Sequence, residues 1–160
     1  MTLRLGLTIV LLLNMQLSFS QDLKSPAHFY TIRLKPHQDL KAELMAFAKQ
    51  NHLKAAFIAT CVGSLEEVNL RYANQPKGTQ QSGHFEIVSL VGTFNDASAH
   101  LHLSVSDLNG KTIGGHMLDG NKIYTTAEIV IGELNDVAFT REVDSTYGYN
   151  ELKVNKRKDE

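Results

Sequence analysis

Apolar and polar residues alternate along most of the chain, a pattern that predicts β-strands rather than helices. From residue 99 to residue 106 the alternation is unbroken: Leu101, Leu103 and Val105 share one face, and histidine and serine occupy the other. Gly63-Ser64 is expected to turn the chain between two shorter apolar segments. The same reasoning predicts further strands at 29–35, 55–62, 68–72, 85–93, 123–131 and 137–143.

One segment has helical spacing instead. Between Asp39 and Asn51 apolar residues recur three and four positions apart, as in an amphipathic helix with one buried side. Asp39 can accept hydrogen bonds from the free N–H groups of the first turn, and Glu43 lies where the helix dipole favours an acid. We therefore predict an α+β fold, a curved, largely antiparallel sheet of about seven strands with one main helix packed on it. It would form one domain at 25–146, followed by a flexible C-terminal tail at 147–160.

Three histidines give the strongest chemical signal. His100 and His102 are two residues apart and therefore share the polar face of the strand at 99–106. His116 follows Gly114-Gly115 in a segment that should return beside that strand. Three neutral imidazoles with an open fourth position are a common way to hold a zinc ion that still binds a ligand. We predict that His100, His102 and His116 bind zinc or another divalent metal. The alternative is a polar sheet face whose histidines serve only solubility.

The register of the hairpin decides between these two interpretations. The Asn109-Gly110 pair is typical of a hairpin turn. If these two residues alone formed the loop, His102 would face Met117, and His116 would point into the apolar face. A three-residue loop at 108–110, with glycine in the left-handed position, sets His102 directly opposite His116. We favour this register because it brings the three imidazoles to one face.

Other polar residues of the predicted strands are candidates for a supporting role. Glu128 lies in the otherwise apolar strand 123–131, where a carboxylate needs a partner such as the metal site, an arginine or a neighbouring subunit. An exposed position would explain it equally well. Arg71 and Arg141 are candidate anion contacts, although ordinary surface arginines fit the same pattern. Cys61 is the single cysteine, and its apolar neighbours predict a buried thiol rather than a disulfide.

The N-terminal segment 1–20 has the pattern of a secretory signal peptide. Arg4 provides a positive start, residues 5–13 form an apolar run too short to span a bilayer, and small residues precede an expected cleavage after Ser20. An N-terminal anchor or a mistaken start codon would explain the same pattern. We expect a protein that is secreted or enters the lumen of the secretory pathway, with no membrane span in its mature chain.

Charge argues against nucleic acid as a partner. The chain has 16 Lys and Arg against 17 Asp and Glu, a formal net charge of −1, so it has no overall positive field. No phosphate-binding loop, nucleophile elbow, Cys-x-x-Cys or His-Glu-x-x-His sequence is present. Whether the protein is an enzyme therefore stays open, and metal binding is as far as the residues lead.

Four ordered motifs resemble the plants-and-prokaryotes conserved (PPC) domain, a family long described as a domain of unknown function. They are GHFEIVSLVG at 83–92, HLHLS at 100–104, GGHM at 114–117 and YTTAEIVI at 124–131. The resemblance covers roughly residues 28–145. It implies a mixed sheet flanked by a helix and assembled as a homotrimer.

The resemblance implies less about function. Plant members couple the domain to AT-hooks, act on AT-rich DNA in nuclei, and use the domain to bind each other and transcription factors. This chain has no Arg-Gly-Arg-Pro hook, and His84 stands where the plant interaction segment has arginine. Its three histidines at 100, 102 and 116 are generally absent from plant members, so it is similar to the stand-alone prokaryotic-type branch.

Three hypotheses follow, in decreasing order of preference. The first is a secreted trimer whose three-histidine zinc site could bind a small ligand. The second is a non-enzymatic module for protein interaction and assembly. The third, disfavoured by charge and by the export signal, is DNA binding as in the plant relatives.

Overall fold

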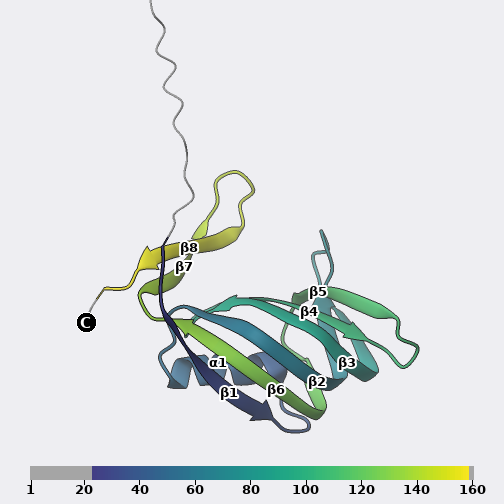
Figure 1. The fold of residues 1–160 in the computed structure, drawn as a ribbon. Coiled ribbons are helices and arrows are strands. Elements are labelled where there is room, and N and C mark those ends of the chain that lie inside the picture. The colour runs from purple at the N-terminus through teal and green to yellow at the C-terminus, as the bar shows by residue number, and fades with distance from the viewer. Residues whose placement is uncertain (1–22, 159–160) are drawn as a thin grey trace, which may run out of the picture.

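The computed structural model describes residues 23–158, and an antiparallel six-stranded sheet is its main element (Figure 1). The predicted signal peptide at 1–20 lies outside the described residues. Along the sheet the strand order is β1-β6-β2-β3-β4-β5. The strands are β1 Ala27–Leu34, β2 Ala56–Arg71, β3 Thr79–Phe94, β4 Ala99–Ser106, β5 Thr112–Met117 and β6 Lys122–Leu134. A separate two-stranded sheet joins β7 Val137–Val143 to β8 Asn150–Lys156.

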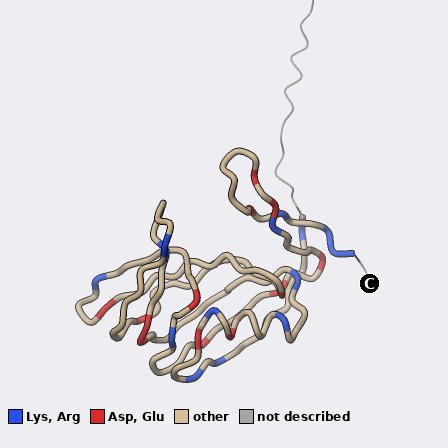
Figure 2. The backbone as a smooth tube through the Cα atoms, turned by 180° about the vertical axis from the view of Figure 1, so that it is seen from behind, with Lys and Arg blue, Asp and Glu red and all other residues tan. Residues whose placement is uncertain are grey.

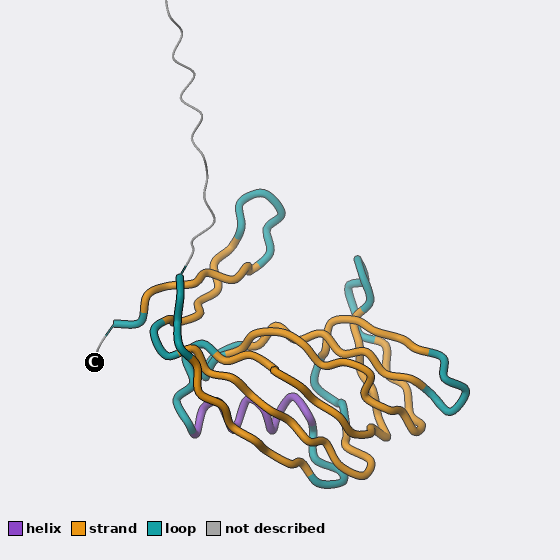
Figure 3. Tube along the Cα trace, in the orientation of Figure 1, coloured by secondary structure: helices purple, strands orange, loops and turns teal. Residues whose placement is uncertain are grey.

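One helix lies within residues 23–158, α1 Leu40–Gln50, and it covers one face of the large sheet (Figure 3). It begins as predicted at Asp39, whose Oδ1 accepts hydrogen bonds from the backbone N–H groups of Lys41 and Ala42 at 3.1 and 3.0 Å. Its buried side consists of Leu40, Leu44 and Ala48, all with no exposed surface. The α+β class is confirmed. Among residues 23–158 no helix is long and apolar enough to cross a bilayer.

One core cluster joins the buried side of α1 to buried side chains of all six strands of the large sheet. Its largest fully buried side chains include Leu65, Phe94, Leu101, Leu103, Met117 and Ile131. Cys61 belongs to this core, as predicted, with 6% of its surface exposed. Burial raises the pKa of its thiol to about 12, so the group stays protonated and inert at neutral pH.

The prediction of a turn at Gly63-Ser64 is wrong, because β2 runs unbroken from Ala56 to Arg71. Gly63 instead marks an irregularity in the pairing of β2 with β6. Its φ of 145° favours glycine, and a β-carbon there would overlap the backbone of Thr126. Ser64 is buried beside it and shares a hydrogen bond of 2.7 Å with the hydroxyl of Thr125. The glycine thus allows close approach of two strands rather than a change of chain direction.

The C-terminal segment also differs from the expected flexible tail. Within 147–160 the structure places β8, which pairs antiparallel with β7. Val137 and Phe139 of β7 are buried in a small second cluster with Ala55, and Val154 of β8 packs against it. Strand β8 was not predicted because its alternation is weak. Its apolar side chains acquire a partner only when β7 lies beside them.

Candidate metal centre

The hairpin formed by β4 and β5 has the three-residue loop that the sequence analysis favoured. Asp107 N–H donates to the carbonyl of Lys111 at 3.0 Å, closing the loop, and Gly110 has a φ of 74°. His102 therefore pairs directly with His116 across the two strands. The prediction of this register is confirmed.

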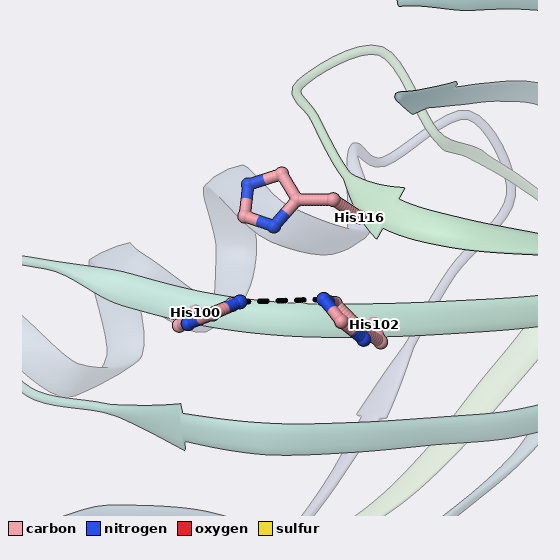
Figure 4. A group of neighbouring side chains, drawn as sticks. All are labelled: His100, His102 and His116. Atoms are coloured by element: carbon pink, nitrogen blue, oxygen red, sulfur yellow. Dashed lines mark hydrogen bonds between the residues drawn. The ribbon is translucent and has the colours of Figure 1, made fainter. Parts of the chain in front are cut away.

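All three histidine rings converge on one point in front of the hairpin (Figure 4). His100 and His102 project from β4, and His116 reaches toward them from β5. One ligand nitrogen from each ring lies within 4.8 Å of the other two. The His100 and His102 Nε2 atoms are 3.2 Å apart. Two nitrogens bound tetrahedrally to one zinc ion would be about 3.3 Å apart, so this pair already has the spacing of ligands.

A second pairing holds His116 in place. The end of β2 lies against β5, so that Arg71 is the register partner of His116 and Leu70 that of Met117. Gly115 allows this approach, since a β-carbon there would lie 2.8 Å from the carbonyl oxygen of Arg71. The loop thus fixes the register of the hairpin, and β2 fixes its far end.

The surroundings keep two of the rings uncharged. Burial and the neighbouring Arg71 lower the pKa of His116 to about 4. Burial, Arg141 and His102 lower the pKa of His100. Uncharged imidazole is the form that coordinates a metal ion. In addition, Nδ1 of His116 is buried without a hydrogen-bond partner. A bound cation would provide the missing partner. The three residues fit a divalent ion.

Arg141 connects the second sheet to this cluster. It lies on β7, and its Nη1 donates to Nδ1 of His100 at 3.3 Å, while its Nη2 donates to the hydroxyl of Thr93 at 3.3 Å. The sequence analysis singled out Arg141 as a candidate anion contact without any reason to place it beside the histidines. Glu151 and Leu152 of β8 line the same region and were missed, because they fell in the predicted tail.

Glu128 is not part of this centre. It lies on β6, paired with Arg33 of β1 on one side and Val62 of β2 on the other, and its side chain is exposed. Strands β2 and β3 separate β6 from β4 in the sheet. Within the single chain, Glu128 therefore occupies the exposed position that was the alternative explanation, and its supporting role stays a prediction. The sequence pattern could not show where Glu128 lies relative to the histidines, because alternation of apolar and polar residues predicts strands but not their order in the sheet.

Comparisons with known proteins agree with this architecture. The family model of the Plants and Prokaryotes Conserved (PCC) domain, the PPC domain named above, matches residues 22–135. The bifunctional protein GlmU of Synechococcus sp. (strain JA-3-3Ab) is 45% identical over 127 residues, which are 79% of this chain and 20% of that protein. The chain thus spans about a fifth of the length of this curated relative.

Several solved structures share the fold. A hypothetical protein from Salmonella cholerae-suis has a TM-score of 0.84 at 47% identity, covering 86% of this chain and 99% of that one. A metal-containing protein from Archaeoglobus fulgidus has a TM-score of 0.71 at 20% identity, covering 84% and 99%. A Bacteroides thetaiotaomicron protein described as DNA-binding has a TM-score of 0.67 at 23% identity, covering 78% and 91%. The last two comparisons show the fold alone.

Proposed function

This chain belongs to the Plants and Prokaryotes Conserved domain family, and on that premise we propose that it is a metal-binding member of the family. His100, His102 and His116 hold one divalent cation, with zinc the first choice for three imidazole nitrogens. The observation that carries the proposal is the convergence of three ring nitrogens to within 4.8 Å. The metal-containing relative from Archaeoglobus fulgidus, which has the same fold, adds support.

A bound zinc ion would supply a Lewis acid with a free coordination position for a small ligand. The protein's own residues orient the three rings and keep them uncharged. The hairpin loop and β2 set their positions, and burial excludes water from one side of His116.

Metal analysis of the purified protein tests this function. We expect about one equivalent of zinc per chain in the wild type and a loss of most of it in His102→Ala. His84→Ala is the matched control, since His84 is exposed and stacks on Tyr124 of β6 rather than on the cluster. A wild type that binds no divalent metal, or an H102A variant with unchanged zinc, would contradict the proposal.

We also propose that the protein is a homotrimer, as its family resemblance implies. Val62 and Val88 support self-association, because they lie on neighbouring strands β2 and β3 and are 55% and 56% exposed. We propose export on the basis of the signal-peptide pattern at 1–20. Histidine ligands suit an oxidising compartment, where thiolate ligands would be at risk.

The exposed valines also favour a second candidate, a non-enzymatic assembly module that needs no metal. In that case replacing the histidines by alanine would leave partner capture in a pull-down unchanged. DNA binding has less support, because acidic and basic residues are interspersed along the chain (Figure 2) and the net charge is −1. A gel shift that persists at physiological salt would support it.

A further inference from the structure

A pocket opens beside the histidine cluster, where the β7–β8 hairpin meets β3 and β4. Its volume is about 260 Å³, smaller than a typical pocket for a drug-sized ligand. His100 and His102 line it from β4, and the hairpin contributes Arg141 and Leu152. The match to the family model ends at residue 135, so the hairpin wall belongs to a part of the chain beyond that match.

The charges around this pocket are mainly positive. A divalent ion bound by three imidazoles keeps its full charge, since none of these ligands is anionic. Arg141 lies 3.3 Å from His100, and Arg71 is the strand partner of His116. The pocket lining contributes one acid, Glu151, whose side chain is exposed. One carboxylate does not balance this positive charge, so the pocket favours an anion as its ligand.

Metal binding would also release Arg141. An arginine only donates, so its contact with Nδ1 of His100 requires that this nitrogen carry no proton. The neutral ring then has its proton on Nε2, the atom that faces His102. If Nε2 held a metal ion, the proton of the neutral ring would lie on Nδ1, which would then not accept a hydrogen bond from Arg141. The guanidinium of Arg141 would then be free to bind an anion beside the metal site.

We propose that this pocket binds a small monocarboxylate, with one end of the carboxylate at the open position of the metal and with Arg141 as its second partner. The planar guanidinium matches a carboxylate in a two-bond geometry. Val91 and Leu152 provide apolar wall for a short alkyl group, and Glu151 disfavours a second negative charge on the ligand. The inference rests on the proposed metal site.

The test uses cobalt-loaded full-length protein, with butyrate as the probe and acetate and inorganic phosphate for comparison. Metal content is measured first, and the cobalt absorption spectrum and calorimetry then report anion binding. We expect Arg141→Gln to retain its metal and to bind butyrate at least about tenfold more weakly, the effect of a lost charged hydrogen bond. Arg141→Lys, which keeps the charge without the planar fork, should be intermediate. Arg33→Gln is the control, because Arg33 lies on β1 and donates to Thr126 instead.

Leu152→Ala provides an independent variant. It should weaken butyrate binding but leave acetate binding unchanged, because only the longer chain reaches the apolar wall. Equal butyrate affinity in R141Q and wild type, with metal present in both, would overturn the inference while leaving the metal site intact. Tighter binding of phosphate than of butyrate would overturn the carboxylate class. A wild type that takes up no cobalt or zinc would overturn the proposed function and this inference together.

Discussion

His116 shows how a single residue acquires its role from its surroundings. Its ring is held between Arg71 on the neighbouring strand and the two histidines of β4, and its pKa falls to about 4. In an unfolded chain the pKa of the same ring would be about 6.5. The folded state therefore resists protonation of a group that is ready to bind metal.

This difference predicts a pH dependence of stability in the metal-free protein. The folded pKa of His116 lies below the unfolded value, so the favourable contribution is complete above about pH 6.5 and is lost as pH falls through about 4. Urea unfolding at pH 7.5, 5.5 and 4.5, values chosen around that window, should show a smaller stability loss on acidification in His116→Gln than in wild type. Parallel losses in the two proteins would contradict the assignment.

The histidines were predictable from the sequence, whereas their neighbours were not. Two local features of the sequence bring the three imidazoles together: the two-residue repeat of a strand and the turn of a hairpin. Arg141 reaches His100 only because β7 returns across the sheet from a position 41 residues away. No periodicity encodes that contact, and none shows that β2 and β3 lie between Glu128 and the histidines of β4.

Two glycines have different structural roles: one forms a turn, and the other allows two strands to pack closely. Gly110, in the β4–β5 loop, has a φ of 74° and open space around it. Gly63, within β2, has a φ of 145° and the backbone of Thr126 directly against it. Both glycines were predicted to form turns. The prediction is confirmed for Gly110 and wrong for Gly63.

Substitution should reveal this difference. Gly110→Ala should reduce the free energy of unfolding by about 1 kcal/mol, the strain of a left-handed alanine. Gly63→Ala should reduce it by more than about 3 kcal/mol, because a strand must also move apart. Denaturant unfolding of the two variants measures both values. A Gly63→Ala variant no less stable than Gly110→Ala would contradict the close packing of β2 against β6.

At the scale of the whole molecule, the sheet leaves apolar side chains uncovered on the face away from α1. Val88 of β3 and Val62 of β2 are each more than half exposed in the single chain. The alternation along β2 and β3 showed that they would be strands, but irregular pairing within both strands decides which side each valine faces. This face is where we expect subunits to meet.

Mass measurement in solution tests that expectation. Analytical ultracentrifugation should give a trimer for the wild type and smaller species for Val88→Lys, because a buried lysine without a partner opposes association. Leu108→Lys is the control, since Leu108 is 84% exposed at the hairpin tip. A monomeric wild type at micromolar concentration, or a Val88→Lys variant that stays trimeric, would argue against this face as the interface.

The central claim is that one divalent cation is bound by three histidine rings from strands β4 and β5. Crystals of the zinc-loaded protein, measured on both sides of the zinc absorption edge, test it directly. We predict one anomalous peak per chain, lying between the side chains of His100, His102 and His116 at distances of about 2.0–2.1 Å from their nitrogens. A peak elsewhere, or three rings that remain apart with no zinc between them, would contradict it.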